Sequence, residues 1–275
     1  CDVATALAAR RLPFVLREGA AADVIPGLAR NAALLVMDRA YLRAPVAWRE
    51  EVLRRTACPV VEVEGDVIVP VETASDHEEY AARTIRPKIN RQRERFLIPV
   101  RKQKTPAGSC DEVFVPVSRE TITTCIAALP VDRSIAPSTR FRGGQTVARD
   151  LLHRFLTHAL ARFDRRNDPT ADAVSLLSPY LHFGQISPVD IACAVRDSGH
   201  ANAEDFLEQL IVRRELAVNF TYYNEHYDRF ACLPDWARAT LEDHARDDRE
   251  TIYTRAQLEA ASTHDAAWNA AQREL

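Results

Sequence analysis

Residues 33–63 read ALLVMDRAYLRAPVAWREEVLRRTACPVVEV, and this stretch decides the fold of the first part of the chain. The unbroken apolar run 33–37 is typical of a strand buried in a parallel sheet. Residues 45–56 carry apolar side chains at helical spacings, and 59–63 form a second strand-like run. A strand, a helix and a strand in such short succession indicate a doubly wound, Rossmann-like α/β domain.

The same alternation extends on both sides of this stretch. We predict a strand over 14–18, a helix over 22–31 and a further strand over 67–71, after the turn at Gly65-Asp66. The α/β domain then covers residues 1–74, and we expect its N-terminal strands to be missing. The chain begins with Cys1 and runs straight into a helical pattern, as expected of a fragment.

Residues 75–142 are expected to form a helix and an inter-domain linker. Ser75 and Glu78 have the spacing of a capping box, so a helix is predicted through 80–85, with an interruption at Pro87. The segment 99–137 has no sustained periodicity and resembles a connection that runs over the surface.

The remaining residues, 143–275, predict an all-helical domain that is incomplete at its C-terminal end. An apolar stripe runs over 147–160, and Ser187-Pro188 begins a second helix. Two more helices are expected over 204–223 and 258–275. The last of these has no stop signal at its end, so we expect the helical domain to continue beyond it.

Composition excludes several classes of protein. With 275 residues, 47% of them hydrophobic and 27% charged, the chain is long enough for two cores and is not disordered. The longest apolar runs are too short to span a membrane. A net charge of −3 means that any nucleic-acid binding must come from a local patch. The six scattered cysteines and eight histidines lack metal-ligand spacings, which indicates a reduced, cytoplasmic protein without a metal site.

Three segments carry information beyond the fold class. In 175–188, Ser178-Pro179 and Ser187-Pro188 are two helix starts, which suit either phosphate binding or plain N-capping. In 206–217, Gln209 and Arg213 stand four residues apart, as partners in a site or in a surface network. In 263–272, Trp268 begins an Ala-rich helix face that permits close helix packing. The alternative interpretation is that Trp268 is only a tryptophan of the hydrophobic core.

The ordered blocks of this sequence closely resemble the class II cyclobutane pyrimidine dimer photolyases. The resemblance is carried by 80–90 (YAARTIRPKIN), 166–169 (RNDP), 177–184 (LSPYLHFG), 210–216 (LIVRREL), 233–237 (LPDWA), and 263–272 with its THD and WNAAQ. It implies an α/β domain joined to a helical domain that holds FAD. In this family, light excites the reduced, anionic flavin, which passes an electron to a dimer flipped out of the DNA duplex.

The resemblance also implies roles for individual residues. The catalytic candidates are Gln209, at the position of a glutamate that touches the dimer, and Trp268, in the chain of tryptophans that reduces the flavin. The expected DNA contacts are Arg166, Asn167 and Arg214. The expected FAD contacts are Phe163, Ser175, Leu176, Leu177, Ser178, Phe206 and Arg213.

Two of these positions depart from the family pattern. An amide at Gln209 still donates a hydrogen bond to a pyrimidine carbonyl but cannot deliver a proton, and Phe163 replaces a tyrosine that hydrogen-bonds FAD. A cryptochrome-like photoreceptor without repair is therefore one alternative. A non-catalytic nucleic-acid-binding module is another, with Arg140, Arg142, Arg162, Arg165, Arg166 and residues 88–95 as its phosphate-contacting surface.

The expected partner is ultraviolet-damaged DNA containing pyrimidine dimers, bound by a monomer with no obligate protein partner and no membrane. An antenna chromophore of unknown identity is possible in the α/β domain. Because the family continues past residue 275 with the other side of the flavin pocket, we expect this fragment to bind FAD weakly and to be inactive in repair.

Overall fold

The computed structural model describes residues 2–100 and 117–274. The chain folds as two compact units, Cys1–Glu225 and His226–Leu275. Among the described helices, none combines the length and the apolarity that a membrane crossing requires. The predicted boundaries after residues 74 and 142 stay predictions.

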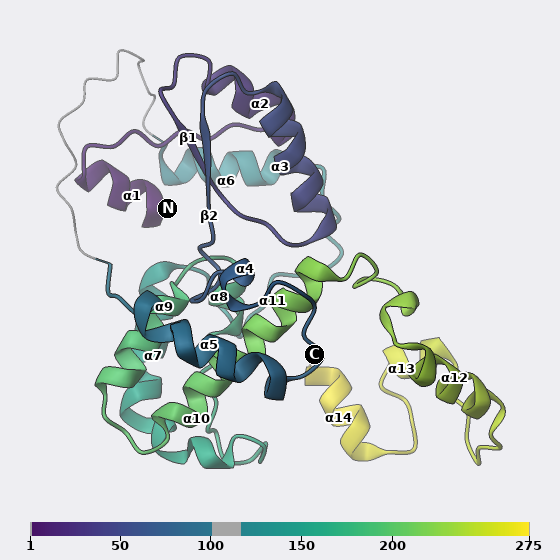
Figure 1. Ribbon diagram of the computed structural model, residues 1–275. Helices are drawn as coiled ribbons and strands as arrows, with labels where there is room; N and C mark the ends of the chain where they lie inside the picture. Colours follow the sequence, from purple (N-terminus) through teal and green to yellow (C-terminus); the bar gives the residue numbers. More distant parts are fainter. Residues whose placement is uncertain (1, 101–116, 275) are drawn as a thin grey trace. The chain divides into compact units, whose positions relative to one another are not determined.

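The first part of the larger unit contains the predicted strand–helix–strand motif. Its elements are α1 (Asp2–Ala9), α2 (Ala21–Leu28), β1 (Leu35–Asp38), α3 (Arg43–Arg55) and β2 (Val60–Val63). The two strands pair in parallel, with Leu35 opposite Val60. Helices α2 and α3 pack on each other and lie beside the strands (Figure 1). The α/β prediction is confirmed at this level.

Two predicted strands are wrong in the described part of the chain, because neither 14–18 nor 67–71 has strand conformation. The sheet there consists of β1 and β2 only, so 14–18 has no neighbour to pair with. In 67–71, the N–H groups of Ile68 and Val69 donate to the Glu215 carboxylate, and Pro70 has no N–H to give to a ladder. The chain turns instead into the short helix α4 (Val71–Ala74).

Helix α5 (Ala82–Phe96) continues through Pro87, where an interruption was predicted. The predicted capping box is also wrong, because Ser75 is extended and buried and its hydroxyl donates to Glu79 at 2.8 Å. The fully buried Ile85 and Ile89 flank Pro87 and hold the helix against the core despite the missing hydrogen bond.

The expected linker contains a helix of its own. Helix α6 (Arg119–Ala128) begins after Ser118, whose hydroxyl accepts the N–H of Thr121. Residues 101–116 of the predicted linker lie outside the described residues.

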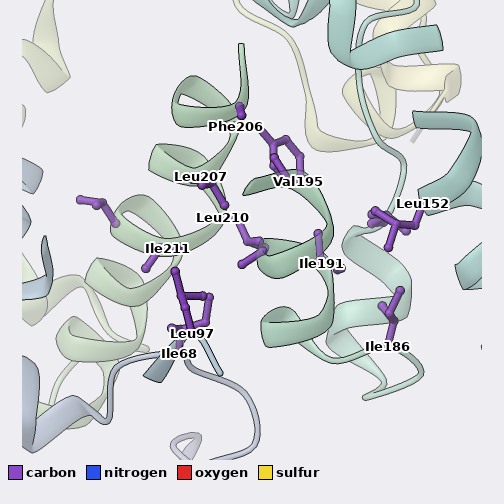
Figure 2. Packing of buried hydrophobic residues seen from close by; sticks show 14 of the residues in the cluster. Ile68, Leu97, Leu152, Ile186, Ile191, Val195, Phe206, Leu207, Leu210 and Ile211 are labelled. Atoms are coloured by element: carbon purple, nitrogen blue, oxygen red, sulfur yellow. The ribbon is translucent and has the colours of Figure 1, made fainter. Parts of the chain in front are cut away.

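The helical part of the larger unit surrounds one hydrophobic core. Its helices are α7 (Gln145–Arg154), η1 (Phe155–Ala159), η2 (Leu160–Arg165), α8 (Ser178–His182), α9 (Pro188–Asp197), α10 (Ala203–Leu207), η3 (Glu208–Arg213) and α11 (Arg214–Tyr223). Figure 2 shows side chains of α10 and η3, among them Phe206 and Leu210, next to Ile191 and Val195 of α9. The predicted helix over 204–223 is confirmed, but η1 and η3 are π-helical turns.

The smaller unit is a series of short helices. They are η4 (Phe230–Cys232), α12 (Asp235–Asp243), η5 (His244–Arg246), α13 (Arg255–Glu259) and α14 (Ala266–Glu274). The single helix predicted over 258–275 is wrong, because Ala261 adopts a left-handed conformation with φ of 51°. A new helix then starts where the Asp265 carboxylate accepts the N–H groups of Ala267 and Trp268. Leu275 lies outside the described residues.

Candidate functional site

The candidate site is built around the helix that runs from α10 through η3 to α11. Within it, the N–H of Arg214 donates to the carbonyl of Gln209, five residues earlier, which is the π-helical pattern. Leu210, Ile211 and Val212 of this turn are buried, whereas Gln209 is half-buried and Arg213 is exposed. The sequence predicted a shared face for Gln209 and Arg213, and the π-turn shifts Arg213 away from that register.

A cavity of about 250 Å³ lies beside the start of α11. It is lined by Asp66, Ser178, Leu181, His182 and Arg214. The Arg214 guanidinium donates to the backbone carbonyl of Asp66 and lies 3.9 Å from its carboxylate. The structure therefore brings together Ser178, expected to contact FAD, and Arg214, expected to contact DNA. Sequence reasoning missed Asp66 and His182, although His182 follows Ser178 by four residues.

A second cavity, of about 180 Å³, lies between the α7–η2 helices and the segment 172–176. Its basic and hydroxyl side chains are Arg154, His158, Arg162 and Ser175, and Leu176 lies beside them. Leu176 is left-handed, with φ of 57°, which separates the side chains of the predicted stretch 175–178. Ser175 and Leu176 face this cavity, Leu177 is 1% exposed in the core, and Ser178 faces the other cavity.

Phe163 and Phe206, both expected to contact FAD, meet in the core. Their ring centroids are 5.3 Å apart, and each packs against Phe155 at 6.0 and 4.7 Å. Arg166 places its guanidinium 5.1 Å from the Phe163 ring and is half-buried. The neighbouring Asn167 is exposed, so it is more open to solvent than Arg166.

The turn that follows Asn167 is held by Asp168. Its carboxylate accepts hydrogen bonds from the Thr170 hydroxyl at 2.6 Å and from Arg165 at 2.7 Å. These bonds, the Thr170 hydroxyl first, lower the pKa of Asp168 to about 2. Asp168 therefore stays ionised and neutralises Arg165, which leaves that arginine less suited to the phosphate-contacting surface considered above.

Helix α11 carries polar side chains that hold the partly buried segment 66–79. The Glu215 carboxylate accepts the N–H of Ile68 at 2.6 Å, and Tyr223 donates to the carbonyl of Ser75 at 2.7 Å. Between them, Asn219 accepts the N–H of Glu79 and donates to the carbonyl of His77. The sequence offered no signal for this arrangement beyond the polar positions themselves.

Two carboxylates in this region have shifted pKa values of opposite sign. Burial raises the pKa of Glu215 to about 8, against the opposing effect of its two backbone N–H donors. Burial alone would also raise the pKa of Glu79, but hydrogen bonds from Lys88, Thr84 and Ser75 lower it to about 2.

Trp268 belongs to the smaller unit, on α14, and is 37% exposed. Its neighbour Asn269 is buried and bonded to Thr263 through side chain and backbone. This network fixes the start of α14 and with it the backbone that carries the indole ring. In the described residues, no group of histidine, cysteine, aspartate and glutamate side chains has the arrangement of a metal site.

Comparisons with known proteins agree on one family. The model of the DNA photolyase family matches residues 1–109. A deoxyribodipyrimidine photo-lyase from Methanothermobacter thermautotrophicus is 42% identical over the whole chain, which covers 60% of that protein. The protein of the same name from Potorous tridactylus is 37% identical over 95% of the chain and 50% of its own length. The chain thus spans half to three-fifths of these relatives.

Solved structures show the same fold. A cryptochrome from Synechocystis matches with a TM-score of 0.65 at 17% identity, over 93% of this chain and 54% of that one. A class III photolyase from Agrobacterium tumefaciens matches with a TM-score of 0.64 at 18% identity, over 99% of this chain and 57% of that one. An archaeal photolyase from Sulfolobus tokodaii, solved with two FAD molecules, has a TM-score of 0.61 at 19% identity, over 89% of this chain and 54% of that one.

Proposed function

We propose that the chain belongs to the photolyase/cryptochrome family and is part of a deoxyribodipyrimidine photo-lyase, an enzyme that splits pyrimidine dimers in DNA. The observation that carries the proposal is the extent of the similarity. Four curated relatives with this name align over 95–100% of the chain at 37–42% identity. Similarity of this extent covers both the α/β part and the helical part.

The proposed cofactor is FAD, and each of the two cavities offers donors that suit its diphosphate, beside one carboxylate residue, Asp66 in one cavity and Asp172 in the other. Arg214 and Ser178 offer a guanidinium and a hydroxyl to one cavity, and Arg154, Arg162 and Ser175 offer the same groups to the other. Such donors are the ones that bind phosphate oxygens in proteins. Reduced FAD, when bound, supplies the electron that opens the cyclobutane ring.

The chain's own residues then have the tasks of holding and orienting. To Gln209, which is half-buried at the π-turn, we assign an amide hydrogen bond to a pyrimidine carbonyl. Phe163, Phe206 and Leu177 supply apolar packing. Asn167 is exposed for a DNA contact, and Arg166 and Arg214 are half-buried next to the proposed cofactor residues. Because the net charge is −3, DNA binding must depend on such local groups.

The proposal is tested on the full-length protein that contains this chain, purified and reconstituted with FAD. We expect flavin absorption bands and, after chemical reduction, loss of dimers from ultraviolet-irradiated DNA under blue light only. A protein that shows no flavin bands after reconstitution but still binds DNA would contradict the proposal. That result would favour the non-catalytic nucleic-acid-binding module.

A cryptochrome-like photoreceptor is the second candidate, and Gln209 is the observation that favours it. An amide cannot deliver a proton to a dimer, whereas a carboxylic acid can. Flavin photoreduction without any dimer loss would support the photoreceptor. Repair that appears only in the Gln209→Glu variant would support it as well, since it would show that the rest of the site is intact.

Finer statements also belong to the proposal. We propose that the protein is a class II photolyase, supported by blocks such as 210–216, and that it acts as a cytoplasmic monomer. A bound antenna chromophore would appear as an additional absorption band that does not change on flavin reduction.

A further inference from the structure

The π-turn η3 joins two charged residues that a regular helix would keep apart. Glu208 and Arg213 are five residues apart, and the Nε atom of Arg213 lies 3.7 Å from Oε1 of Glu208. In an α-helix, neighbours on one face are three or four residues apart, which would set Glu208 against Ile211 and Val212. In a π-turn, the i to i+5 hydrogen bonding places the fifth residue, here Arg213, on the same side of the helix as Glu208.

Glu208 is itself fixed by an arginine from another helix. Arg86 of α5 donates to it from Nε at 3.0 and 3.2 Å and from Nη2 at 2.7 Å. Two guanidinium groups thus share one carboxylate, and the group of three carries one net positive charge. The Glu208 side chain is only 25% exposed, so its position is set by the protein, whereas the Arg213 side chain is 56% exposed.

We propose that Glu208, held by Arg86, positions Arg213 so that the outer guanidinium nitrogens of Arg213 donate hydrogen bonds to a phosphate oxygen. No hydrogen bond occupies those nitrogens in the part of the chain that the structure describes. The proposal rests on the proposed function, because the phosphate is either the diphosphate of FAD or a phosphodiester of DNA. Arg86 and Glu208 are positioning residues, since both act through Arg213.

A control ion pair distinguishes the proposed positioning of Arg213 from a purely structural role of the Arg86–Glu208 pair. A second ion pair links the same two helical segments, in which Arg93 of α5 contacts Glu204 of α10 at 2.9 and 3.2 Å. It has similar distances but makes no contact with Arg213. Loss of helix docking alone would therefore weaken the binding of riboflavin together with FAD in Glu208→Gln, and to a smaller extent in Glu204→Gln, whose side chain is 66% exposed.

The experiment measures affinities of the full-length protein that contains this chain for three probes: FAD, riboflavin and a fluorescein-labelled oligothymidylate. Riboflavin has the ring system without phosphates, so it separates phosphate contacts from ring contacts. We expect Arg86→Gln, Glu208→Gln and Arg213→Gln each to weaken one phosphate-bearing probe about three- to tenfold, the size of a coupling between neighbouring charged groups. The affected probe, FAD or oligothymidylate, identifies the source of the phosphate. Glu204→Gln should stay within about twofold, as expected for an exposed pair.

A double variant provides the second readout. Glu208→Gln combined with Arg213→Gln should bind no more weakly than Arg213→Gln alone, because Glu208 acts only through that arginine. Tighter binding in Glu208→Gln would overturn the proposal, since it would show that Glu208 acts only as a repelling charge. Unchanged binding of both phosphate probes, or equal losses of riboflavin and FAD binding in Glu208→Gln, would overturn it too. A wild-type protein that binds neither probe would instead overturn the proposed function, and with it the phosphate partner named here.

Discussion

Side chains of helix α11 bind backbone groups that, in a sheet, a neighbouring strand would bind. Glu215, Asn219 and Tyr223 follow one another at four-residue intervals, so they lie on one face of the helix. That face satisfies backbone groups of the partly buried segment 66–79, in which only residues 71–74 are helical. Because an unpaired buried N–H or C=O is costly, these three residues allow the non-helical parts of the segment to lie in the core.

Replacement of Glu215 is the sharpest test of this interpretation. Glu215→Ala removes the acceptor of the Ile68 and Val69 N–H groups, and we expect a loss of about 1–3 kcal/mol in the free energy of unfolding. Urea denaturation measures this loss. Glu18→Ala, at an exposed position, is the control and should change stability by less than about 0.5 kcal/mol. Equal stabilities of the two variants would show that the hydrogen bonds of Glu215 contribute nothing to holding the segment 66–79.

Trp268 can be tested as an electron relay. In the full-length protein, Trp268→Phe should slow light-driven flavin reduction but leave repair by chemically pre-reduced enzyme nearly intact, because indole is oxidised more readily than a phenyl ring. The ring is 37% exposed, so the packing loss should be of order 1 kcal/mol or less. Photoreduction rate and thermal midpoint are measured on the same sample. Unchanged photoreduction in a folded variant would rule out the relay, and a large loss of stability would identify a packing residue.

At the scale of elements, the two Ser-Pro helix starts differ. Ser187 caps α9 by accepting the N–H of Val189 at 3.2 Å, and Pro188 occupies the first turn. Ser178 is the first residue of α8 and makes no capping bond, because Leu177 occupies the cap position. Its hydroxyl faces the cavity that also holds Arg214.

This difference predicts opposite effects for one substitution at two positions. Ser187→Ala should lower the free energy of unfolding by about 1 kcal/mol and leave FAD affinity unchanged. Ser178→Ala should leave stability unchanged and weaken FAD binding, because it removes a proposed phosphate donor. Urea denaturation and flavin titration of both variants test the pair. Weaker FAD binding in Ser187→Ala alone would contradict the placement of the diphosphate.

The elements also show how far the sequence predicts this structure. The run 33–37 and the pattern 45–56 predicted β1 and α3 because apolar periodicity responds to burial. The strand predicted over 67–71 was wrong because an apolar run indicates that a segment is buried but does not indicate which group accepts its backbone N–H groups. The π-turn at Glu208–Arg213 was not predicted, because the apolar residues on both sides were interpreted as the stripe of one α-helix. The candidate residues came from resemblance, whereas Asp66, His182 and Arg86 required coordinates.

For the whole molecule, the larger unit joins an α/β part and a helical part through polar contacts as well as apolar ones. Arg39, directly after β1, donates to Tyr222 of α11 at 2.9 Å and to Glu72 at 2.8 Å. The apolar core continues from Ile68 and Val69 into the helices that follow. Stability of this unit should therefore respond to the ionisation of the acids at the junction.

Two acids at that junction set opposite pH dependences. The Glu215 carboxyl faces Arg214 and Glu64, and its folded pKa of about 8 exceeds the ordinary 4.5. Between these values the folded state binds more protons, so the contribution of Glu215 falls as pH rises from about 4.5 to 8. Glu79, which faces Lys88 and His77, has a folded pKa of about 2. Its contribution is complete above about 4.5 and is lost as pH falls toward 2.

Urea denaturation of wild type, Glu215→Gln and Glu79→Gln over pH 2–9 separates the two effects, because a glutamine side chain does not titrate. The stability advantage of wild type over Glu215→Gln should shrink between about pH 4.5 and 8 and be constant on either side. Its advantage over Glu79→Gln should instead grow between about pH 2 and 4.5. Glu204→Gln, at an exposed ion pair, is the control and should show at most a small pH-dependent difference. A difference between wild type and Glu215→Gln that stays constant with pH would mean that Glu215 titrates normally, with its two N–H donors offsetting the cost of burial.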